Sequence, residues 1–393
     1  MLKVDSLDHN GRGIAHLSNK VVFIENALED EIVEINITNE KKNYLEATVY
    51  RYIQKSDERI EGLCPYYEVC GGCDILHMSY KKQLDFKQNK IRNIVDKYLD
   101  KNIKVNKIVE SNNQFEYRNK VTFQVKNELG FYKNKTNDIV KINKCLLASK
   151  KINNSIEYLN KLDLNKINRI TCRSTSNELM IIIDSNSDID VSPIKAIASS
   201  IYIKDKLVYG NPNIYNIIGA YKYIISPDSF FQINDDICKK LYDKIKKETK
   251  DSKDILDLYC GTGSIGIYVS ENKNVLGIEI NESAIKDANI NKEINDIKNI
   301  KFICGDSGKE SKKINFKPDT IIVDPPRSGL DTNTINNILG LNPNKIIYVS
   351  CDPMTLVRDL KLLSDNYSIN EINPFDMFPN TKHVETITIL ERK

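Results

Sequence analysis

The sequence lacks an apolar run long enough to cross a membrane, and its first residues are too mixed in polarity for a signal peptide. These absences predict a cytoplasmic protein with no membrane partner. The sequence also lacks a marked net charge, because 57 basic residues face 54 acidic ones and the formal net charge is +3. Any nucleic-acid partner must therefore be sought in local patches, since the global charge does not indicate one.

The chain contains nine cysteines. In a reducing compartment they are not expected to form disulfides, so metal binding or catalysis is the preferred interpretation. Its length of 393 residues allows two or three domains, and 40% hydrophobic with 28% charged residues is an ordinary globular composition. Changes in pattern along the chain predict three domains, at residues 1–56, 57–220 and 221–393.

The first domain has the pattern of a small β unit. Residues 21–24 and 31–37 are short β-branched runs, and the second run alternates with polar residues. Several short strands in about 56 residues predict a small barrel of the oligonucleotide-binding kind.

The central domain, expected to be α+β, opens with a cluster of cysteines. Cys64, Cys70 and Cys73 lie within ten residues, and Cys145 is a fourth candidate ligand far downstream. Four thiolates suit either tetrahedral zinc or an iron–sulfur cluster, and the spacing alone leaves both open. Residues 81–107 predict a basic amphipathic helix, which suits either contact with phosphates or a solvated face. Residues 115–125 and 130–140 predict paired strands.

The third domain alternates apolar strands with helices, which predicts an α/β, Rossmann-like, doubly wound and mostly parallel sheet. The predicted strands are residues 254–258, 275–278, 301–303, 320–323, 346–349 and 386–390.

A glycine-rich turn follows the first of these strands and contains Tyr259, Gly261 and Ser264. Glycines at a helix start let the backbone approach a ligand, and Glu279 ends the next strand, where a carboxylate can accept both ribose hydroxyls. Asp306 follows the third strand, in position to meet an adenine edge. No lysine follows the glycines as it does in a phosphate-binding loop, so the pattern favours S-adenosylmethionine over a nucleoside triphosphate.

Three reactive side chains are expected at the same sheet edge. Asp324 begins an Asp-Pro-Pro-Arg loop, Cys351 follows the fifth strand, and Glu385 precedes the last strand. A cysteine at a strand end can be a small buried hydrophobe, but a thiol beside a carboxylate is a catalytic constellation. The remaining thiols are expected to be buried: Cys172, Cys238, Cys260 and Cys304.

Together these motifs resemble the S-adenosylmethionine-dependent RNA (uracil-5-)-methyltransferases, especially the cluster-containing members that modify 23S ribosomal RNA. The resemblance spans nearly the whole chain. It implies that residues 1–56 form a TRAM domain and that the four cysteines bind a [4Fe–4S] cluster. It also implies that Gln232, Tyr259, Glu279 and Asp324 surround S-adenosylmethionine, with Cys351 as nucleophile and Glu385 as base.

The resemblance implies that the Cys351 thiolate adds to uracil C6, C5 takes the methyl group, and Glu385 removes the C5 proton. The enzyme is expected to act on RNA as a monomer. Two alternatives remain, a tRNA T-loop uracil-5 methyltransferase and a non-catalytic RNA-binding iron–sulfur protein. Cytosine-5 enzymes would carry a cysteine in or beside the Asp-Pro-Pro loop, and amino-group enzymes an aromatic residue where Arg327 stands.

Overall fold

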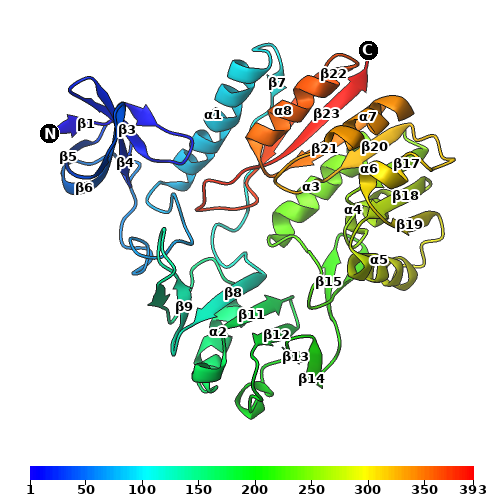
Figure 1. Ribbon diagram of the computed structural model, residues 1–393, viewed down its shortest axis with the longest axis horizontal. Coiled ribbons are helices and arrows are strands. Elements are labelled where there is room, and N and C mark those ends of the chain that lie inside the picture. Colours follow the sequence, from blue (N-terminus) through cyan, green and yellow to red (C-terminus); the bar gives the residue numbers. More distant parts are fainter. The chain divides into compact units, whose positions relative to one another are not determined.

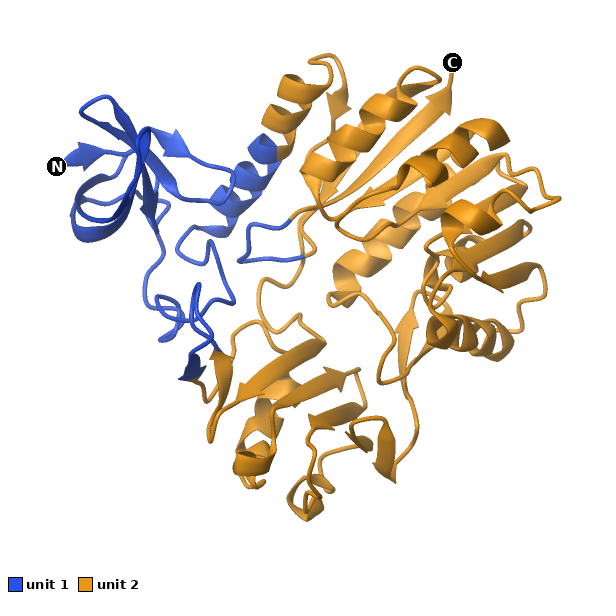
Figure 2. Cartoon of the chain, viewed as in Figure 1, with its two compact units in different colours: residues 1–90, 132–140, 378–383 blue, residues 91–131, 141–377, 384–393 orange.

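The computed structural model describes residues 1–393, and the chain divides into two compact units (Figure 2). Unit 1 comprises residues 1–90, 132–140 and 378–383, and unit 2 comprises residues 91–131, 141–377 and 384–393. No helix combines the length and the apolar character that a membrane crossing requires.

The N-terminal part of unit 1 is a six-stranded, largely antiparallel sheet (Figure 1). Alternate residues of its strands, such as Val22, Ile24, Val33 and Leu45, share one apolar core. This alternation is what the sequence showed, and the strands predicted at 21–24 and 31–37 are confirmed. In the order β1-β5-β6-β4-β3-β2, the sheet contains β1 (Leu2–Lys3), β5 (Ile32–Glu40), β6 (Tyr44–Gln54), β4 (Lys20–Glu25), β3 (Gly13–Leu17) and β2 (Ser6–Leu7).

The predicted basic helix is α1 (Tyr80–Tyr98), which ends earlier than residue 107. In unit 1 its Lys87 is fully buried and donates from Nζ to the carbonyl oxygen of Phe378 at 3.0 Å. Gln83 exchanges hydrogen bonds of 3.0 and 2.8 Å with Asn380. Lys87 was expected on a solvated or phosphate-binding face. Its ammonium instead supports residues 378–383, because a buried charge must have hydrogen-bond partners.

A seven-stranded sheet occupies the middle of the chain, and its strands β8, β11, β12, β13 and β14 adjoin in that order in unit 2. β8 also pairs with β9, so the predicted strand pairing is confirmed over a shorter stretch. The bounds are β8 (Lys120–Val125), β9 (Leu129–Tyr132), β10 (Ile139–Lys141), α2 (Lys150–Leu159), β11 (Arg169–Ser174), β12 (Leu179–Asp184), β13 (Ser200–Ile203) and β14 (Lys206–Gly210). A separate hairpin follows, formed by β15 (Ile214–Ile218) and β16 (Tyr221–Ile225).

An eight-stranded sheet forms the C-terminal part of unit 2, in the order β19-β18-β17-β20-β21-β23-β22-β7. All six predicted strands are present, and the sheet is mostly parallel. The sequence did not predict β22, which pairs antiparallel with β23. The bounds are β19 (Ile300–Cys304), β18 (Asn274–Glu279), β17 (Asp254–Leu258), β20 (Thr320–Val323), β21 (Lys345–Ser350), β23 (Glu385–Arg392), β22 (Tyr367–Phe375) and β7 (Lys104–Val105).

Helices alternate with these strands, and short polar side chains start several of them. Asn234 caps α3, and Asp352 caps α8 by accepting hydrogen bonds from the N–H groups of Met354 and Thr355. Pro353 then occupies the first turn, so the chain changes direction directly after β21. The helices are α3 (Asp235–Glu248), α4 (Ser264–Val269), α5 (Glu282–Ile294), α6 (Ser307–Glu310), α7 (Thr332–Leu341) and α8 (Pro353–Leu363).

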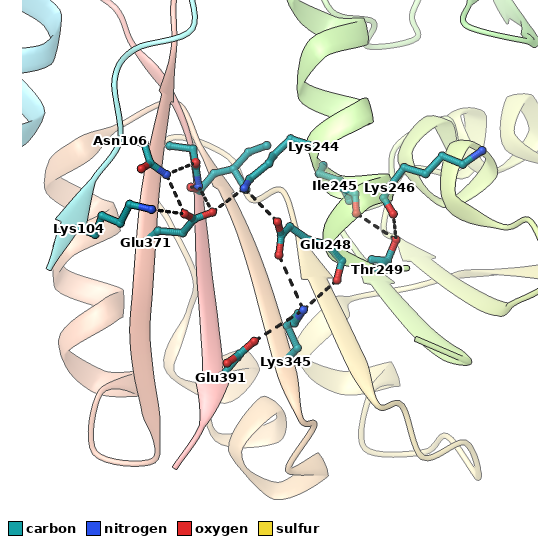
Figure 3. Close-up of polar contacts among 12 residues, drawn as sticks. Lys104, Asn106, Lys244, Ile245, Lys246, Glu248, Thr249, Lys345, Glu371 and Glu391 are labelled. Atoms are coloured by element: carbon teal, nitrogen blue, oxygen red, sulfur yellow. Dashed lines mark hydrogen bonds and ion pairs between the residues drawn. The ribbon is translucent and has the colours of Figure 1, made fainter. Parts of the chain in front are cut away.

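A network of paired charges fastens α3 to the sheet in unit 2 (Figure 3). Glu371 on β22 accepts hydrogen bonds from Lys244 at 2.5 Å and from Asn106 at 2.8 Å. Lys244 also pairs with Glu248 at 3.0 Å, and Lys345 on β21 donates to the Glu248 carbonyl oxygen at 2.9 Å. Every carboxylate in this group therefore has a cationic partner.

Candidate active site

The carboxyl ends of four strands meet at one edge of the eight-stranded sheet. β18, β17, β20 and β21 run parallel to one another, with Leu258 opposite Val323 and Val323 opposite Tyr348. Residues that follow these strands are consequently brought together, as predicted. The edge carries Tyr259, Glu279, Asp324 and Cys351.

Glu385 reaches the same edge from the opposite strand direction. β23 runs antiparallel to β21 and pairs Thr386 with Ser350, and the Thr386 hydroxyl donates to the Ser350 carbonyl oxygen at 3.1 Å. One residue beyond this pair, Cys351 directly follows the end of β21, and Glu385 is the first residue of β23. The sequence placed Glu385 just before the last strand, whereas it is the first residue of that strand.

Burial raises the pKa values of Glu385, Cys351 and Asp324 at this edge, and neighbouring negative charge adds to the shifts of the first two. Glu385 is 3% exposed, and burial followed by the Asp324 carboxylate raises its pKa well above the usual range. Burial, then Glu385 and Asp324, raises the pKa of Cys351 to about 11. Burial raises the pKa of Asp324 to about 7. Clustered acids with raised pKa values are typical of functional sites.

Arg327 is the one cation that opposes these shifts. It is exposed, two residues beyond the first proline of the Asp-Pro-Pro loop, and its charge acts to lower the pKa values of both Cys351 and Glu385. The sequence analysis used Arg327 only to exclude amino-group enzymes and missed this role. Its position directly after the two prolines was the available signal, because the prolines restrict the backbone of the loop that carries it.

The glycine-rich turn after β17 has the backbone of a ligand cradle. Tyr259, Gly261 and Gly263 all have positive φ, at 61°, 52° and 73°. A Cβ at Gly261 would have no atom within 4 Å, so space is open beside it, whereas one at Gly263 would lie 2.4 Å from the Phe302 ring. The turn therefore combines a tightly packed side with an open side, which suits a nucleoside such as that of S-adenosylmethionine.

Glu279 fixes this turn. Its Oε2 accepts a hydrogen bond from the N–H of Gly261 at 3.1 Å, and its Oε1 accepts one from the N–H of Asn281 at 2.9 Å. Each carboxylate oxygen keeps a further lone pair for a ribose hydroxyl. Beneath the turn, buried Asp257 accepts the N–H of Gly266 at 3.0 Å, and burial, with the charge of Asp324, raises its pKa to about 8. Sequence reasoning missed Asp257, although a carboxylate within an apolar strand was a visible signal.

The other predicted cofactor residues have partners of their own. Asp306 caps α6 by accepting the N–H of Lys309 at 3.0 Å. The Ser264 hydroxyl lies 2.6 Å from that of Tyr242. Gln232 is 8% exposed, in the irregular segment between β16 and α3.

The predicted cluster ligands are divided between the units. Cys64, Cys70 and Cys73 belong to unit 1 and are partly exposed, whereas Cys145 belongs to unit 2. No group of three or more histidine, cysteine, aspartate or glutamate side chains is arranged to hold a metal ion. The donor set has the chemistry of a cluster site, but the predicted cluster is not confirmed.

The thiols without a predicted role are mostly buried. Cys172, Cys238 and Cys260 are buried as expected, but Cys304 is exposed. The expectation was wrong for Cys304 because it ends β19, the outermost strand on that side of the sheet.

Two family models match separate parts of the chain, and homologous proteins match it over nearly its whole length. The model described as tRNA (uracil-5-)-methyltransferase matches residues 188–393, and the TRAM domain model matches residues 2–50. An uncharacterized RNA methyltransferase from Clostridium acetobutylicum is 32% identical and covers 99% of this chain and 96% of its own. Another from Caldanaerobacter subterraneus is 33% identical and covers 99% and 97%.

The fold also matches a solved structure. The tRNA (uracil-54, C5)-methyltransferase of Pyrococcus abyssi, in complex with S-adenosyl-L-homocysteine, superposes with a TM-score of 0.82 at 27% identity, covering 99% of this chain and 100% of that one. These matches agree with the predicted methyltransferase family and N-terminal domain. The chain belongs to the tRNA (uracil-5-)-methyltransferase family of S-adenosylmethionine-dependent RNA methyltransferases and carries an N-terminal TRAM domain.

Proposed function

We propose that this protein methylates C5 of a uridine in RNA through a covalent bond between Cys351 and uracil C6. The observation that carries the proposal is the pairing of β21 with β23, because it brings a thiol and a carboxyl group to one sheet edge beside the glycine-rich turn. A nucleophile with a nearby base is what addition to an electron-poor ring requires.

The proposed reaction balances without an oxidant or a metal. The Cys351 thiolate adds to C6, and the C5–C6 electron pair moves into an enolate. C5 then attacks the sulfonium methyl group, which releases S-adenosylhomocysteine. Glu385 takes the C5 proton, and elimination breaks the S–C6 bond and restores both the ring and the thiolate. A uridine must leave its base stack for this reaction, which suits an RNA-binding N-terminal domain.

The remaining side chains at the edge would hold the methyl donor and adjust the charge. In the proposal, Tyr259, Gly261, Ser264, Glu279 and Asp306 bind its nucleoside part. In the same proposal, Gln232 lies in the pocket for donor and substrate, and Asp324 lies beside the methyl donor. Arg327 favours the two deprotonated groups that the reaction needs, because its charge lowers the pKa values of Cys351 and Glu385.

The first candidate substrate is 23S ribosomal RNA, supported by the resemblance of the four-cysteine pattern to that branch of the family. The second is a tRNA T-loop uridine, supported by the similarity to the Pyrococcus abyssi tRNA enzyme over 99% of the chain. We also propose that the enzyme acts as a cytoplasmic monomer.

We propose as well that Cys64, Cys70, Cys73 and Cys145 bind a [4Fe–4S] cluster, on the basis of thiolate chemistry and spacing. Anaerobic purification should yield iron and acid-labile sulfide in a ratio near one, and Cys145→Ser should lower both. Protein with neither iron nor sulfide after anaerobic purification would contradict the cluster.

The function is tested by incubating the protein anaerobically with methyl-labelled S-adenosylmethionine and either 23S ribosomal fragments or unmodified tRNA. Digestion of the RNA should release labelled 5-methyluridine from one of the two. Label in a methylated amino group or ribose would contradict C5 chemistry. Binding of RNA without any transfer would favour the non-catalytic alternative.

A further inference from the structure

Residues 226–234, which include Gln232, connect β16 to α3. This segment forms neither a helix nor a strand. Backbone carbonyl groups in such a segment need partners from elsewhere. Two side chains of the neighbouring seven-stranded sheet supply them, Arg173 from β11 and Asn119, which directly precedes β8.

Arg173 holds the start of the segment. Its side chain is buried, with the residue 2% exposed, and its Nη1 donates to the carbonyl oxygens of Ser226 at 2.7 Å and Pro227 at 3.1 Å. The same nitrogen lies 3.5 Å from the Ser229 hydroxyl. Burial lowers the pKa of Arg173 to about 10. Burying a guanidinium destabilises the fold unless its hydrogen bonds recover the free energy lost on leaving water. The bonds of Arg173 to the carbonyl oxygens of Ser226 and Pro227 serve this purpose.

Asn119 holds the end of the segment. Its Nδ2 donates to the carbonyl oxygen of Gln232 at 2.9 Å and to Oδ1 of Asp235 at 2.9 Å, and its N–H donates to the carbonyl oxygen of Ile233 at 3.1 Å. Asn216 of β15 donates to the same Asp235 oxygen at 2.9 Å. The main chain at Gln232 is thus tied directly to one side chain of the sheet.

Asn119 and Arg173 lie at the same part of the seven-stranded sheet. β8 and β11 pair antiparallel with Lys120 opposite Arg173, and the N–H of Ser174 donates to the carbonyl oxygen of Asn119 at 2.8 Å. Asn119 and Arg173 are therefore joined to the same pair of hydrogen-bonded strands. Gln232, whose carbonyl oxygen accepts from Asn119, is 8% exposed.

We propose that Asn119 and Arg173 are positioning residues of the methyl-transfer reaction, which hold residues 226–235 so that Gln232 keeps its place in the substrate pocket. The inference rests on the proposed function, in which Gln232 contacts donor and base. Neither residue needs to touch RNA or S-adenosylmethionine. Misplacing a group by about 1 Å can lower a rate by about 10²-fold.

A double-mutant cycle separates positioning from general stability. We would compare Asn119→Ala, Gln232→Ala and the double variant, with the wild type measured in parallel. Asn299→Ala is a matched control, because Asn299 also donates from Nδ2 to two carbonyl oxygens, of Ser270 and Lys273. It lies directly before β19, the edge strand of the eight-stranded sheet. Each variant would be measured for kcat, KM for RNA, melting temperature and the Kd of S-adenosylhomocysteine.

Asn119→Ala should lower kcat about 10- to 100-fold in the presence of Gln232, and by less than about threefold when Gln232 is already alanine. Its melting temperature should match that of Asn299→Ala, which keeps wild-type kcat. Arg173→Lys, which keeps the charge but offers fewer donors, should lose less activity than Arg173→Met.

Two results would overturn the inference alone, namely equal losses of kcat from Asn119→Ala with and without Gln232, or the same kcat for Asn119→Ala and Asn299→Ala. Failure of the wild type to form 5-methyluridine would instead overturn the proposed function, and the inference with it.

Discussion

Two glutamates on paired strands have opposite electrostatic environments. Glu371 lies on β22 among Lys244, Asn106 and Lys104, whereas Glu385 begins β23 beside Cys351 and Asp324 (Figure 3 shows the first). Burial would raise the pKa of Glu371, but hydrogen bonds from Lys244, Asn106 and Asn373 outweigh it and lower the pKa to about 2. For Glu385, burial and Asp324 act together and raise the pKa.

The same sheet therefore uses one glutamate, Glu371, to stabilise the fold and another, Glu385, at the candidate active site. A paired carboxylate holds β22, α3 and β7 together and stays ionised. Glu385 has no cationic hydrogen-bond partner and lies near other acids, so its environment disfavours the ionised form. A carboxylate with a raised pKa accepts a proton more readily and is therefore a better base.

The largest loss is expected from Cys351→Ala, which removes the proposed nucleophile. Methyl transfer should fall by more than about 10³-fold while S-adenosylhomocysteine still binds, because no other group can add to C6. Labelled-methyl counting on RNA measures the rate. Cys304→Ala, at an exposed thiol of the same sheet, is the control and should keep its activity.

Glu385→Gln should lower turnover by about 10²- to 10⁴-fold, because an amide cannot take the C5 proton. The block comes after methyl transfer, so a methylated protein–RNA adduct should accumulate on ordinary, unsubstituted RNA and appear as a shifted band on a denaturing gel. The same change at the paired strand, Glu371→Gln, should leave turnover nearly unchanged. Equal losses in both variants would erase the proposed distinction between the two carboxyl groups.

The pH dependence of kcat/KM should rise with pH. Cys351 reacts as a thiolate, and with a pKa of about 11 in the free enzyme only a small fraction is ionised at neutral pH. Between pH 6 and pH 8 the rate should therefore increase by about tenfold per pH unit. Arg327→Met removes the charge that lowers the pKa values of Cys351 and Glu385, so its profile should shift to higher pH. A profile that falls with pH, or that is unmoved in Arg327→Met, would contradict this electrostatic account.

The smallest effect concerns folding. Because the folded-state pKa of Glu371 is lowered to about 2, its ionised form stabilises the fold above the unfolded-state pKa, and this contribution is lost as the pH falls toward 2. Glu371→Gln should reduce the free energy of unfolding by about 1–2 kcal/mol at pH 7, allowing for solvent screening. Denaturant unfolding at several pH values measures it, and a loss that does not shrink in acid would contradict the pairing.

Much of the site could be predicted because parallel strands end at one edge. Apolar runs located the strands, and counting to their ends placed Tyr259, Glu279, Asp324 and Cys351 together. β22 was not predicted, because Glu371 and other polar residues interrupt its first half and hide the strand pattern.

Contacts between distant segments leave no periodic signal in a sequence. The bond from Arg173 to Ser226 and Pro227 spans more than fifty residues, and its donor looks like an ordinary charge on a strand. The same reason explains why Lys87 was expected at the surface, although it is buried and donates to the carbonyl oxygen of Phe378. Only tertiary structure decides which lysine or arginine on a patterned face turns inward.

The proposed bond between Cys351 and uracil C6 can be trapped and identified. RNA with 5-fluorouridine at the target position carries a fluorine that cannot leave as a proton, so the adduct should persist after methylation. Mass spectrometry of the digested complex should find the nucleotide on the peptide that contains Cys351, with one added methyl group. Formation of 5-methyluridine in ordinary RNA without any trapped adduct, or an adduct on another cysteine, would contradict the account.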